Sequence, residues 1–320
     1  MSFKDELILA PLLGVTNYLF RSVYSTHFKS FDRAIIPFIT KGNFDKKTSI
    51  LKRELSSEIN KNLPATAQIL TNNPDDFIIC AKNVYSLRGK VLNWNLGCPY
   101  PQVIKKRRGG GMLPYVDDIK NFLDKAIPSI PVKMSIKVRL GLDTSDTIYK
   151  LIEIFNDYPL EELIIHPRTV EQLYTGSVDL DVFSECLTLS KHEVVYNGDI
   201  YTVADYKRLK ERFPEIKKWM IGRGAVRNPL LAEKIKNESL DERLSENDLI
   251  RIMNFHDDLV EAYKKILSGD KHLLDKMKEV ISYLYFSFDS NDKTLKKILR
   301  SQTLQEYLFS TRSLFKMDVD

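Results

Sequence analysis

Short runs of branched apolar residues recur along the first three quarters of the chain, at intervals of about 25 to 45 residues. Between them, apolar positions follow helical spacing, as over residues 75–87 and 203–213. Strands that alternate with helices build a parallel sheet through right-handed crossovers, and eight such units close a barrel. The eight runs begin near Leu7, Ala34, Ala65, Val91, Met134, Glu162, Glu193 and Lys218.

This alternation predicts an α/β fold in the form of a (β/α)8 TIM barrel. Polar residues and glycines collect at the C-terminal ends of the predicted strands, which is where barrel sites assemble. The count of eight and this placement favour a closed barrel over the alternative, an open doubly wound sheet.

After about residue 240 the strand pattern gives way to continuous helical periodicity, which begins at a helix cap at Ser245. We therefore expect residues 1–240 to form the barrel and residues 241–320 to form a small all-helical C-terminal domain. The apolar positions expected to be packed in its first helix include Ile252, Phe255, Leu259, Tyr263 and Ile266.

The composition is that of an ordinary soluble protein. It has 43% hydrophobic residues and no apolar stretch that approaches the roughly 20 residues of a membrane span. The first residues lack a signal-peptide pattern, so we expect a cytoplasmic protein without membrane contact. A monomer is expected, because the tail offers the barrel a partner surface. The net charge of +5 permits contact with a polyanion without requiring it.

The chain has three cysteines, Cys80, Cys98 and Cys186. They are too few for a disulfide framework, and no Cys/His cluster offers a metal site. Cys80 and Cys186 fall in amphipathic segments and are expected in the core. Cys98 is different, since it ends the fourth strand between a glycine and a proline that turn the chain. We expect its thiol to be accessible at the rim, with Asn95 pointing the same way.

Two cationic clusters accompany these features. The run Lys105–Arg108 directly precedes Gly109–Gly111 and is expected to form a flexible rim loop. A second cluster shares one face of a predicted tail helix and comprises Lys293, Lys296, Lys297 and Arg300. Each cluster is either a solvated surface or a contact for phosphates.

The ends of the last four strands predict a phosphorylated ligand. Lys137 and Arg139 alternate onto the lumen face, so the ligand carries or develops negative charge unless a structural ion pair neutralises them. The segments 197–199 and 222–224 place glycines and an arginine where barrels bind phosphate. Flavin mononucleotide (FMN) fits this arrangement, with its ring near Lys137 and Gln68.

With these motifs the chain resembles the tRNA-dihydrouridine synthase family, flavoenzymes that reduce the C5–C6 double bond of particular tRNA uridines with NADPH. The resemblance spans nearly the whole chain. The motifs that carry it are APLLGVTN at 10–17, NLGCP at 95–99, KVRLG at 137–141, His166 with Arg168-Thr169, NGDI at 197–200 and IGRG at 221–224.

The resemblance implies roles for individual residues. Cys98 would protonate C5 of a uridine flipped out of its loop, after hydride transfer from the NADPH-reduced flavin to C6. A thiol with a pKa of about 8.5 stays mostly protonated at cytosolic pH and suits this role. The tail would help to hold tRNA. The implied flavin-binding residues are Pro11, Leu12, Leu13, Gln68, Lys137, His166, Asn197, Gly198, Asp199, Gly222 and Arg223, and the implied substrate contacts are Asn95, Arg139 and Arg168.

The chain departs from the family pattern at three points. Pro167 stands where glycine is usual, Gly111 stands where alanine is common, and the run Lys105–Arg108 is unusually dense. These departures leave the modified uridine open. Two alternatives also stay open: a flavin barrel that acts on a small molecule, which the helical tail disfavours, and a catalytically silent RNA-binding protein, which Cys98 and Lys137 disfavour.

Overall fold

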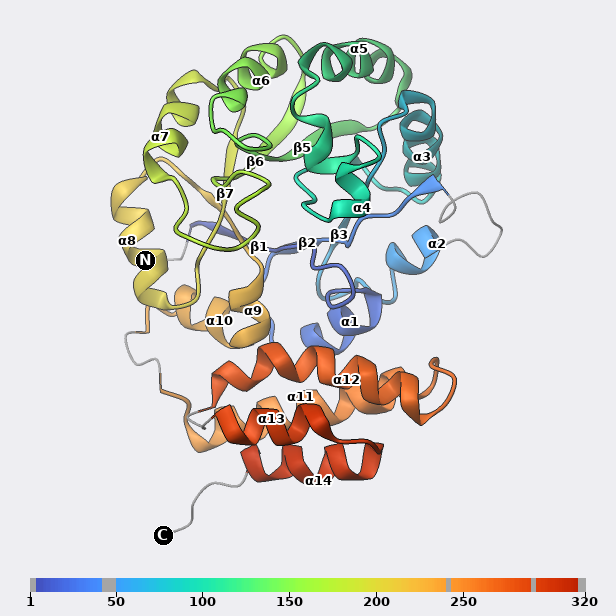
Figure 1. Ribbon diagram of the computed structural model, residues 1–320, viewed down its shortest axis with the longest axis vertical. Coiled ribbons are helices and arrows are strands. Elements are labelled where there is room, and N and C mark those ends of the chain that lie inside the picture. Colours follow the sequence, from blue (N-terminus) through green and yellow to red (C-terminus); the bar gives the residue numbers. More distant parts are fainter. Residues whose placement is uncertain (1–3, 42–49, 240–242, 289–291, 316–320) are drawn as a thin grey trace.

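Eight parallel strands close into a barrel in the computed structural model, which describes residues 4–41, 50–239, 243–288 and 292–315 (Figure 1). Strands pair in chain order and β8 returns to pair with β1, so the predicted closed barrel is confirmed and the open sheet is wrong. The strands are β1 Glu6–Leu9, β2 Arg33–Ile35, β3 Ala65–Ile69, β4 Val91–Leu96, β5 Lys133–Arg139, β6 Leu160–His166, β7 Val194–Asn197 and β8 Lys218–Ile221.

Helices in the connections cover the outside of the barrel (Figure 1). The two predicted examples are observed as α3 and α8, and each begins at a side-chain cap: Asn73 accepts from Asp75 N, and Thr202 accepts from Asp205 N. The helices are α1 Tyr18–His27, α2 Ile50–Glu54, α3 Pro74–Ser86, α4 Pro101–Ile104, α5 Val116–Ala126, α6 Thr147–Phe155, α7 Leu180–Leu189, α8 Val203–Arg212, α9 Arg223–Arg227 and α10 Leu231–Lys236, with 3-10 turns η2 Gly109–Met112 and η3 Ile127–Ser129.

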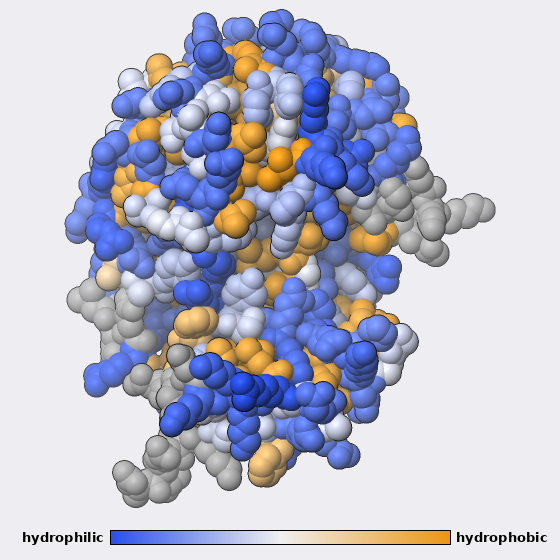
Figure 2. Space-filling model, viewed as in Figure 1, coloured by the Kyte–Doolittle hydropathy of each residue, from blue (hydrophilic) through white to orange (hydrophobic). Residues whose placement is uncertain are grey.

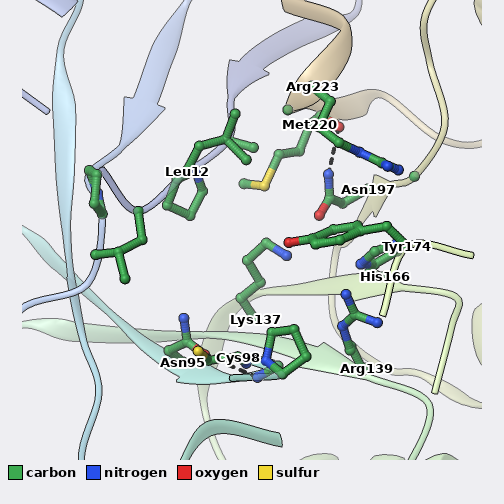
Figure 3. A pocket seen from close by; sticks show the side chains of 18 of the residues that line it. Leu12, Asn95, Cys98, Lys137, Arg139, His166, Tyr174, Asn197, Met220 and Arg223 are labelled. Atoms are coloured by element: carbon green, nitrogen blue, oxygen red, sulfur yellow. Dashed lines mark hydrogen bonds between the residues drawn. The ribbon is translucent and has the colours of Figure 1, made fainter. Parts of the chain in front are cut away.

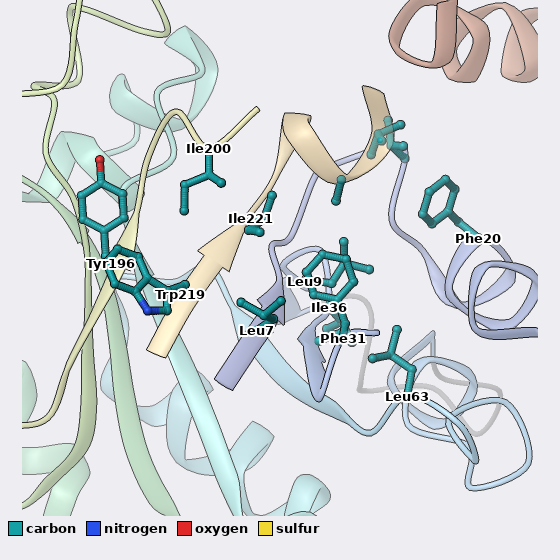
Figure 4. Close-up of a cluster of buried hydrophobic side chains, with 14 of the residues drawn as sticks. Leu7, Leu9, Phe20, Phe31, Ile36, Leu63, Tyr196, Ile200, Trp219 and Ile221 are labelled. Carbon is teal, nitrogen blue, oxygen red and sulfur yellow. The ribbon is translucent and has the colours of Figure 1, made fainter. Parts of the chain in front are cut away.

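The strands bury apolar side chains on both faces. In β1, Leu7 and Leu9 belong to the large layer between strands and helices, whereas Ile8 belongs to a small layer inside the lumen. Figure 4 shows part of the outer layer, where Leu7 and Leu9 lie near Ile221 of the neighbouring strand. The inner layer comprises Ile8, Ala10, Ile35, Ile164, Val195 and Met220.

Ion pairs gather at the N-terminal ends of the strands. Arg33 donates to Glu6 at 2.5 Å and to Glu162 at 2.6 Å, and Lys218 lies 3.4 Å from Glu162. The Glu162 side chain is only 3% exposed, so its charge depends on these two cations. Because acids balance bases here, this end of the barrel needs no external ion.

The chain after the barrel is helical, as predicted. Ser245 caps α11 through a capping box with Asp248. Phe255 of α11 packs edge-on against Phe20 of α1 and against Phe28, the residue after α1, at ring-centroid distances of 5.6 and 5.3 Å. This contact joins the tail to the barrel. The tail helices are α11 Glu246–Lys264, α12 Asp270–Leu284, α13 Asp292–Arg300 and α14 Leu304–Phe315, with the 3-10 turn η4 Tyr285–Ser287.

One predicted core position in the tail is wrong. Ile266 is 49% exposed, because α11 ends at Lys264 and Ile266 falls in the following turn. The other four predicted positions are buried. The predicted boundary between residues 240 and 241 lies outside the described residues. Within the described parts of the chain, no helix is both long and apolar enough to cross a membrane.

Removing Glu162 should destabilise the barrel strongly. Glu162→Ala removes the buried carboxylate that Arg33 and Lys218 share and leaves them only the more exposed Glu6 and Glu193. We expect the free energy of unfolding to fall by about 3 kcal/mol in urea titrations. The matched control is Glu161→Ala, which removes the neighbouring, partly exposed partner of Lys133 and should cost less than about 1 kcal/mol. Equal losses in the two variants would contradict this account.

Candidate active site

The C-terminal ends of the strands open into a cavity of about 1140 Å³, a volume that includes space open to solvent. Segments following most of the eight strands contribute to its wall, and α12 of the tail adds Tyr283. Fourteen of the fifteen predicted site residues line this cavity; the exception is Arg168. The structure therefore brings together residues spread from Pro11 to Arg223.

A chain of side-chain amides supports the end of β4. The Asn95 Oδ1 accepts from the backbone N of Gly97 and Cys98, at 3.1 and 2.9 Å, and its Nδ2 donates to Gln68 Oε1 at 2.9 Å. Gln68 in turn donates to Asn93 at 2.8 Å. An amide nitrogen carries two N–H groups, so Asn95 and Gln68 each keep one donor for a ligand.

Cys98 is less exposed than predicted. The residue is 6% exposed, and Gly109 packs so closely that an added Cβ there would lie 2.8 Å from the Cys98 Cβ. The thiol is therefore not freely accessible at the rim and reaches open space only through the cavity that it lines. Burial raises the pKa of the thiol, and a hydrogen bond from the Tyr100 backbone and the charges of Arg139 and Lys137 offset this only in part. The thiol is protonated at neutral pH.

The segment after Cys98 is not the flexible loop that the glycines suggested. It forms α4 and η2, and Gly109–Gly111 are buried. An added Cβ on Gly111 would lie 2.5 Å from the Ile104 Cα, and one on Gly110 would lie close to the Val170 side chain. These glycines are needed because no larger residue fits, and they hold the Cys98 segment against the barrel.

Lys137 and Arg139 face the cavity, as predicted. Arg139 donates to the Thr169 carbonyl at 2.7 Å, and within the described parts of the chain neither cation pairs with a carboxylate. Burial first, and then the charge of Arg139, lower the pKa of Lys137 to about 7. Burial likewise lowers the pKa of Arg139 to about 10. An anion in the cavity would raise the pKa values of both side chains.

His166 is held in its neutral form. Burial and the surrounding cations, Arg139 and Lys137 first among them, hold the pKa of its imidazole well below the usual range. Its Nε2 lies 3.2 Å from Nη1 of Arg168, which can only donate. Nε2 is therefore the acceptor, and Nδ1 carries the proton.

Arg168 does not fit the predicted contact with substrate. It is 1% exposed, lies outside the cavity lining and donates two hydrogen bonds to Asp199. It also donates to the carbonyls of Gly176 and Thr175, at 2.7 and 3.3 Å. With its N–H groups used in this way, Arg168 instead positions Asp199 and the connection between β6 and α7.

The ends of β7 and β8 form the remaining wall. Asn197 donates to the Met220 carbonyl at 2.9 Å (Figure 3), and Arg223 donates one hydrogen bond to Asp199 at 3.1 Å. Of the charged residues that line the cavity, Lys137, Arg139 and Arg223 are cations and Asp199 is the carboxylate. Arg168, which lies outside the cavity lining, already pairs with Asp199. The cavity thus has an excess of positive charge, which suits an anionic ligand.

Comparison with known proteins identifies the family. The sequence model described as "Dihydrouridine synthase (Dus)" matches residues 8–311, which include both the barrel and most of the helical tail. The chain belongs to the dihydrouridine synthase family. The predicted family is therefore confirmed.

Curated relatives among the dihydrouridine synthases are distant in sequence. A protein of Pasteurella multocida named tRNA-dihydrouridine synthase B is 27% identical over 244 residues, which cover 75% of this chain and 71% of that protein. A probable tRNA-dihydrouridine synthase of Aquifex aeolicus is 23% identical and covers 89% and 88% of the two chains. A relative from Arabidopsis thaliana, 26% identical, is named for position 47; 74% of this chain matches 35% of that protein.

Solved structures of other proteins share the barrel fold of this chain. Morphinone reductase superposes with a TM-score of 0.52 at 12% identity, covering 76% of this chain and 88% of that one. An old yellow enzyme homologue from Zymomonas mobilis gives a TM-score of 0.54 at 11% identity, covering 78% and 94%. At such low identity the likeness concerns the fold alone.

The tyrosines in the cavity wall were not predicted from the sequence. Tyr174 points into the cavity, with its ring centroid 4.4 Å from the Arg223 guanidinium carbon and 5.2 Å from that of Arg139 (Figure 3). Tyr100 and Tyr283 also line the cavity. Tyr174 and Tyr283 lie away from strand ends. The other site residues were predicted because they stand at the C-terminal ends of strands, and that criterion does not select these two tyrosines.

Replacing Lys137 should change how stability depends on pH in the ligand-free protein. Because its pKa is about 7 in the folded state and 10.5 ordinarily, the unfolded state binds more protons between these values. The free energy of unfolding then rises with pH across this window, and the penalty for the buried ammonium is complete below about pH 7. Urea titrations should show that the free energy of unfolding of wild type rises relative to that of Lys137→Met between about pH 7 and 10.

Lys133→Met, at the exposed start of the same strand, controls for the loss of a lysine. Parallel stability curves for wild type and Lys137→Met would refute the lowered pKa.

Proposed function

We propose that this chain is a tRNA-dihydrouridine synthase that binds FMN, uses NADPH as reductant and reduces the C5–C6 double bond of specific D-loop uridines. The observation that carries the proposal is the cavity itself, where three cations face one already paired carboxylate beside the protonated thiol of Cys98. The names of the curated relatives support tRNA as the substrate. We place the reaction in the cytoplasm and expect a monomer.

The lining fits a phosphorylated flavin. Lys137 contributes a cation with no carboxylate partner in the described chain, Arg223 keeps N–H groups beyond its bond to Asp199, and Leu12 and Met220 supply an apolar wall (Figure 3). When bound, the flavin supplies the hydride for C6 of the uracil ring. The residues that would hold it are Pro11, Leu12, Leu13, Gln68, Lys137, His166, Asn197, Gly198, Asp199, Gly222 and Arg223.

Cys98 would serve as the proton donor to C5. Its raised pKa keeps the proton on Sγ until negative charge develops on the ring. The charges of Arg139 and Lys137 lower the thiol pKa relative to burial alone, so they would stabilise the thiolate that remains. Solvent protons then restore the thiol.

Two residues near Cys98 would hold the uracil. Arg139 faces the cavity, and Asn95 keeps one N–H after its bonds to the backbone and to Gln68. These donors match the carbonyl oxygens of a uracil ring. They would orient the ring and would transfer no proton.

The helical tail would bind the tRNA backbone. The predicted cationic face lies on α13, where its four residues border a shallow groove with Ser301 and Glu306. We therefore assign FMN binding and catalysis to residues 1–240 and tRNA binding to residues 241–320. Salt-sensitive binding of tRNA would distinguish this function from the reduction of a small molecule.

Cys98→Ala should abolish synthesis but not binding. General acid catalysis contributes about 10²- to 10⁴-fold, so we expect at least a hundredfold loss of dihydrouridine formation with flavin and tRNA bound as in wild type. The measurement is dihydrouridine mapping in tRNA from cells that lack this protein and carry either variant. Cys186→Ala, buried in α7 away from the cavity, is the matched control. Loss of flavin from Cys98→Ala would contradict the proton-donor role.

Arg223→Met should weaken flavin binding. A hydrogen bond to a charged group contributes about 1.5–3 kcal/mol, so the dissociation constant for FMN should rise roughly tenfold to a hundredfold in fluorescence titrations of the apoprotein. Arg212→Met, which removes a surface arginine paired with Asp181, controls for the loss of charge. If both variants bind FMN like wild type, the phosphate does not lie at the end of β8.

A further inference from the structure

Two tyrosines at the mouth of the cavity have no aromatic or arginine partner in the described chain. Tyr100 follows β4 and is 52% exposed, whereas Tyr283 lies on α12 and is partly buried. Both line the cavity. In the described chain, neither ring packs on another ring or a guanidinium, and neither hydroxyl makes a hydrogen bond.

Other aromatic rings in this part of the molecule each have an arginine guanidinium over one face. The guanidinium of Arg107 lies over Tyr115 at 4.2 Å, that of Arg227 lies over Phe286 at 4.1 Å, and that of Arg223 lies over Tyr174. Arginine covers each of these rings through cation–π contact. Since Tyr100 and Tyr283 lack such an arginine in the described chain and line the cavity, their rings suit a planar ligand that arrives with the substrate.

The charges beside Tyr100 indicate what that ligand is. The cationic run Lys105–Arg108 follows Tyr100 after the single turn of α4, and in the described chain no carboxylate pairs with these four residues, although Arg108 donates to the Asn72 side chain. Some exposed lysines elsewhere on the barrel do have such a partner, as Lys120 has Asp124 and Lys125 has Asp75. An unneutralised run next to exposed aromatic rings is typical of surfaces that bind single-stranded nucleic acid.

The view of the surface agrees with this placement. Figure 2 shows strongly hydrophilic side chains on both sides of a hollow between the barrel and the tail. Tyr283 approaches the cavity from the tail and Tyr100 from the barrel. A nucleotide strand that enters the cavity from this face would pass between them.

We propose that Tyr100 and Tyr283 are stacking platforms for the unpaired nucleobases that flank the target uridine. Flipping a base into the cavity leaves its neighbours without a stacking partner, and this unstacking costs free energy. The two phenol rings would replace the lost partner and so offset part of that cost. The proposal rests on the proposed function, because it requires tRNA to be the substrate.

The test compares leucine and phenylalanine at each position. Leucine keeps the apolar bulk but lacks a planar ring, whereas phenylalanine keeps the ring and loses only the hydroxyl. Tyr100→Leu and Tyr283→Leu should each raise KM for tRNA about tenfold, equivalent to about 1.4 kcal/mol, while the phenylalanine variants stay within about twofold of wild type. Because stacking is present before and during the reaction, kcat should change much less than KM.

Tyr85→Leu is the matched control, since Tyr85 is 61% exposed on α3 and lies outside the cavity lining. Equal KM values for the leucine and phenylalanine variants would overturn the proposal, as would a loss confined to kcat and flavin content, which indicates misfolding. If wild-type enzyme forms no dihydrouridine in tRNA, the proposed function itself fails, and this result is separate from any effect of the tyrosines.

Discussion

Closure of the sheet is the constraint on which the rest of the structure depends. The pairing of β1 with β8 sets Leu9 opposite Ile221, and Ala10 N donates to the Ile221 carbonyl at 2.9 Å. The residues that follow these two strands, Pro11 to Leu13 and Gly222 to Arg223, therefore border the same cavity although they lie near opposite ends of the barrel sequence. Parallel strands place all their C-terminal ends on one rim, so closure alone gathers the site.

The two ends of the barrel differ in how their charges are balanced. At the N-terminal end, Arg33 and Lys218 meet Glu6 and Glu162. At the C-terminal end the carboxylate of Asp199 is already engaged, and the remaining cations have no acid within the described chain. Burial first, and then this imbalance, lower the pKa of Lys137 and of His166. One end thus contributes to stability, and the other is prepared for an anion.

The helical tail is part of the cavity wall as well as a neighbour of the barrel. Lys276 of α12 donates to the Gly14 carbonyl at 2.8 Å, and Tyr263 of α11 donates to Asn17 at 3.1 Å. Both contacts hold the connection after β1, which lines the cavity through Leu12 and its neighbours. A movement of the tail would therefore displace the residues after β1 that line the cavity.

The sequence by itself determined the strands, most of the site and the family, because strand periodicity and residues at strand ends are local properties. It identified Lys137 and Arg139 as lumen cations and placed Ser245 at a helix start. Only the tertiary structure showed that Arg168 is already bonded to Asp199 and that Cys98 is covered by Gly109. It alone brought Tyr174 and Tyr283 to the same cavity. The physical reason is that a residue's availability depends on which distant partners use its hydrogen bonds and surface, and no local pattern records those partners.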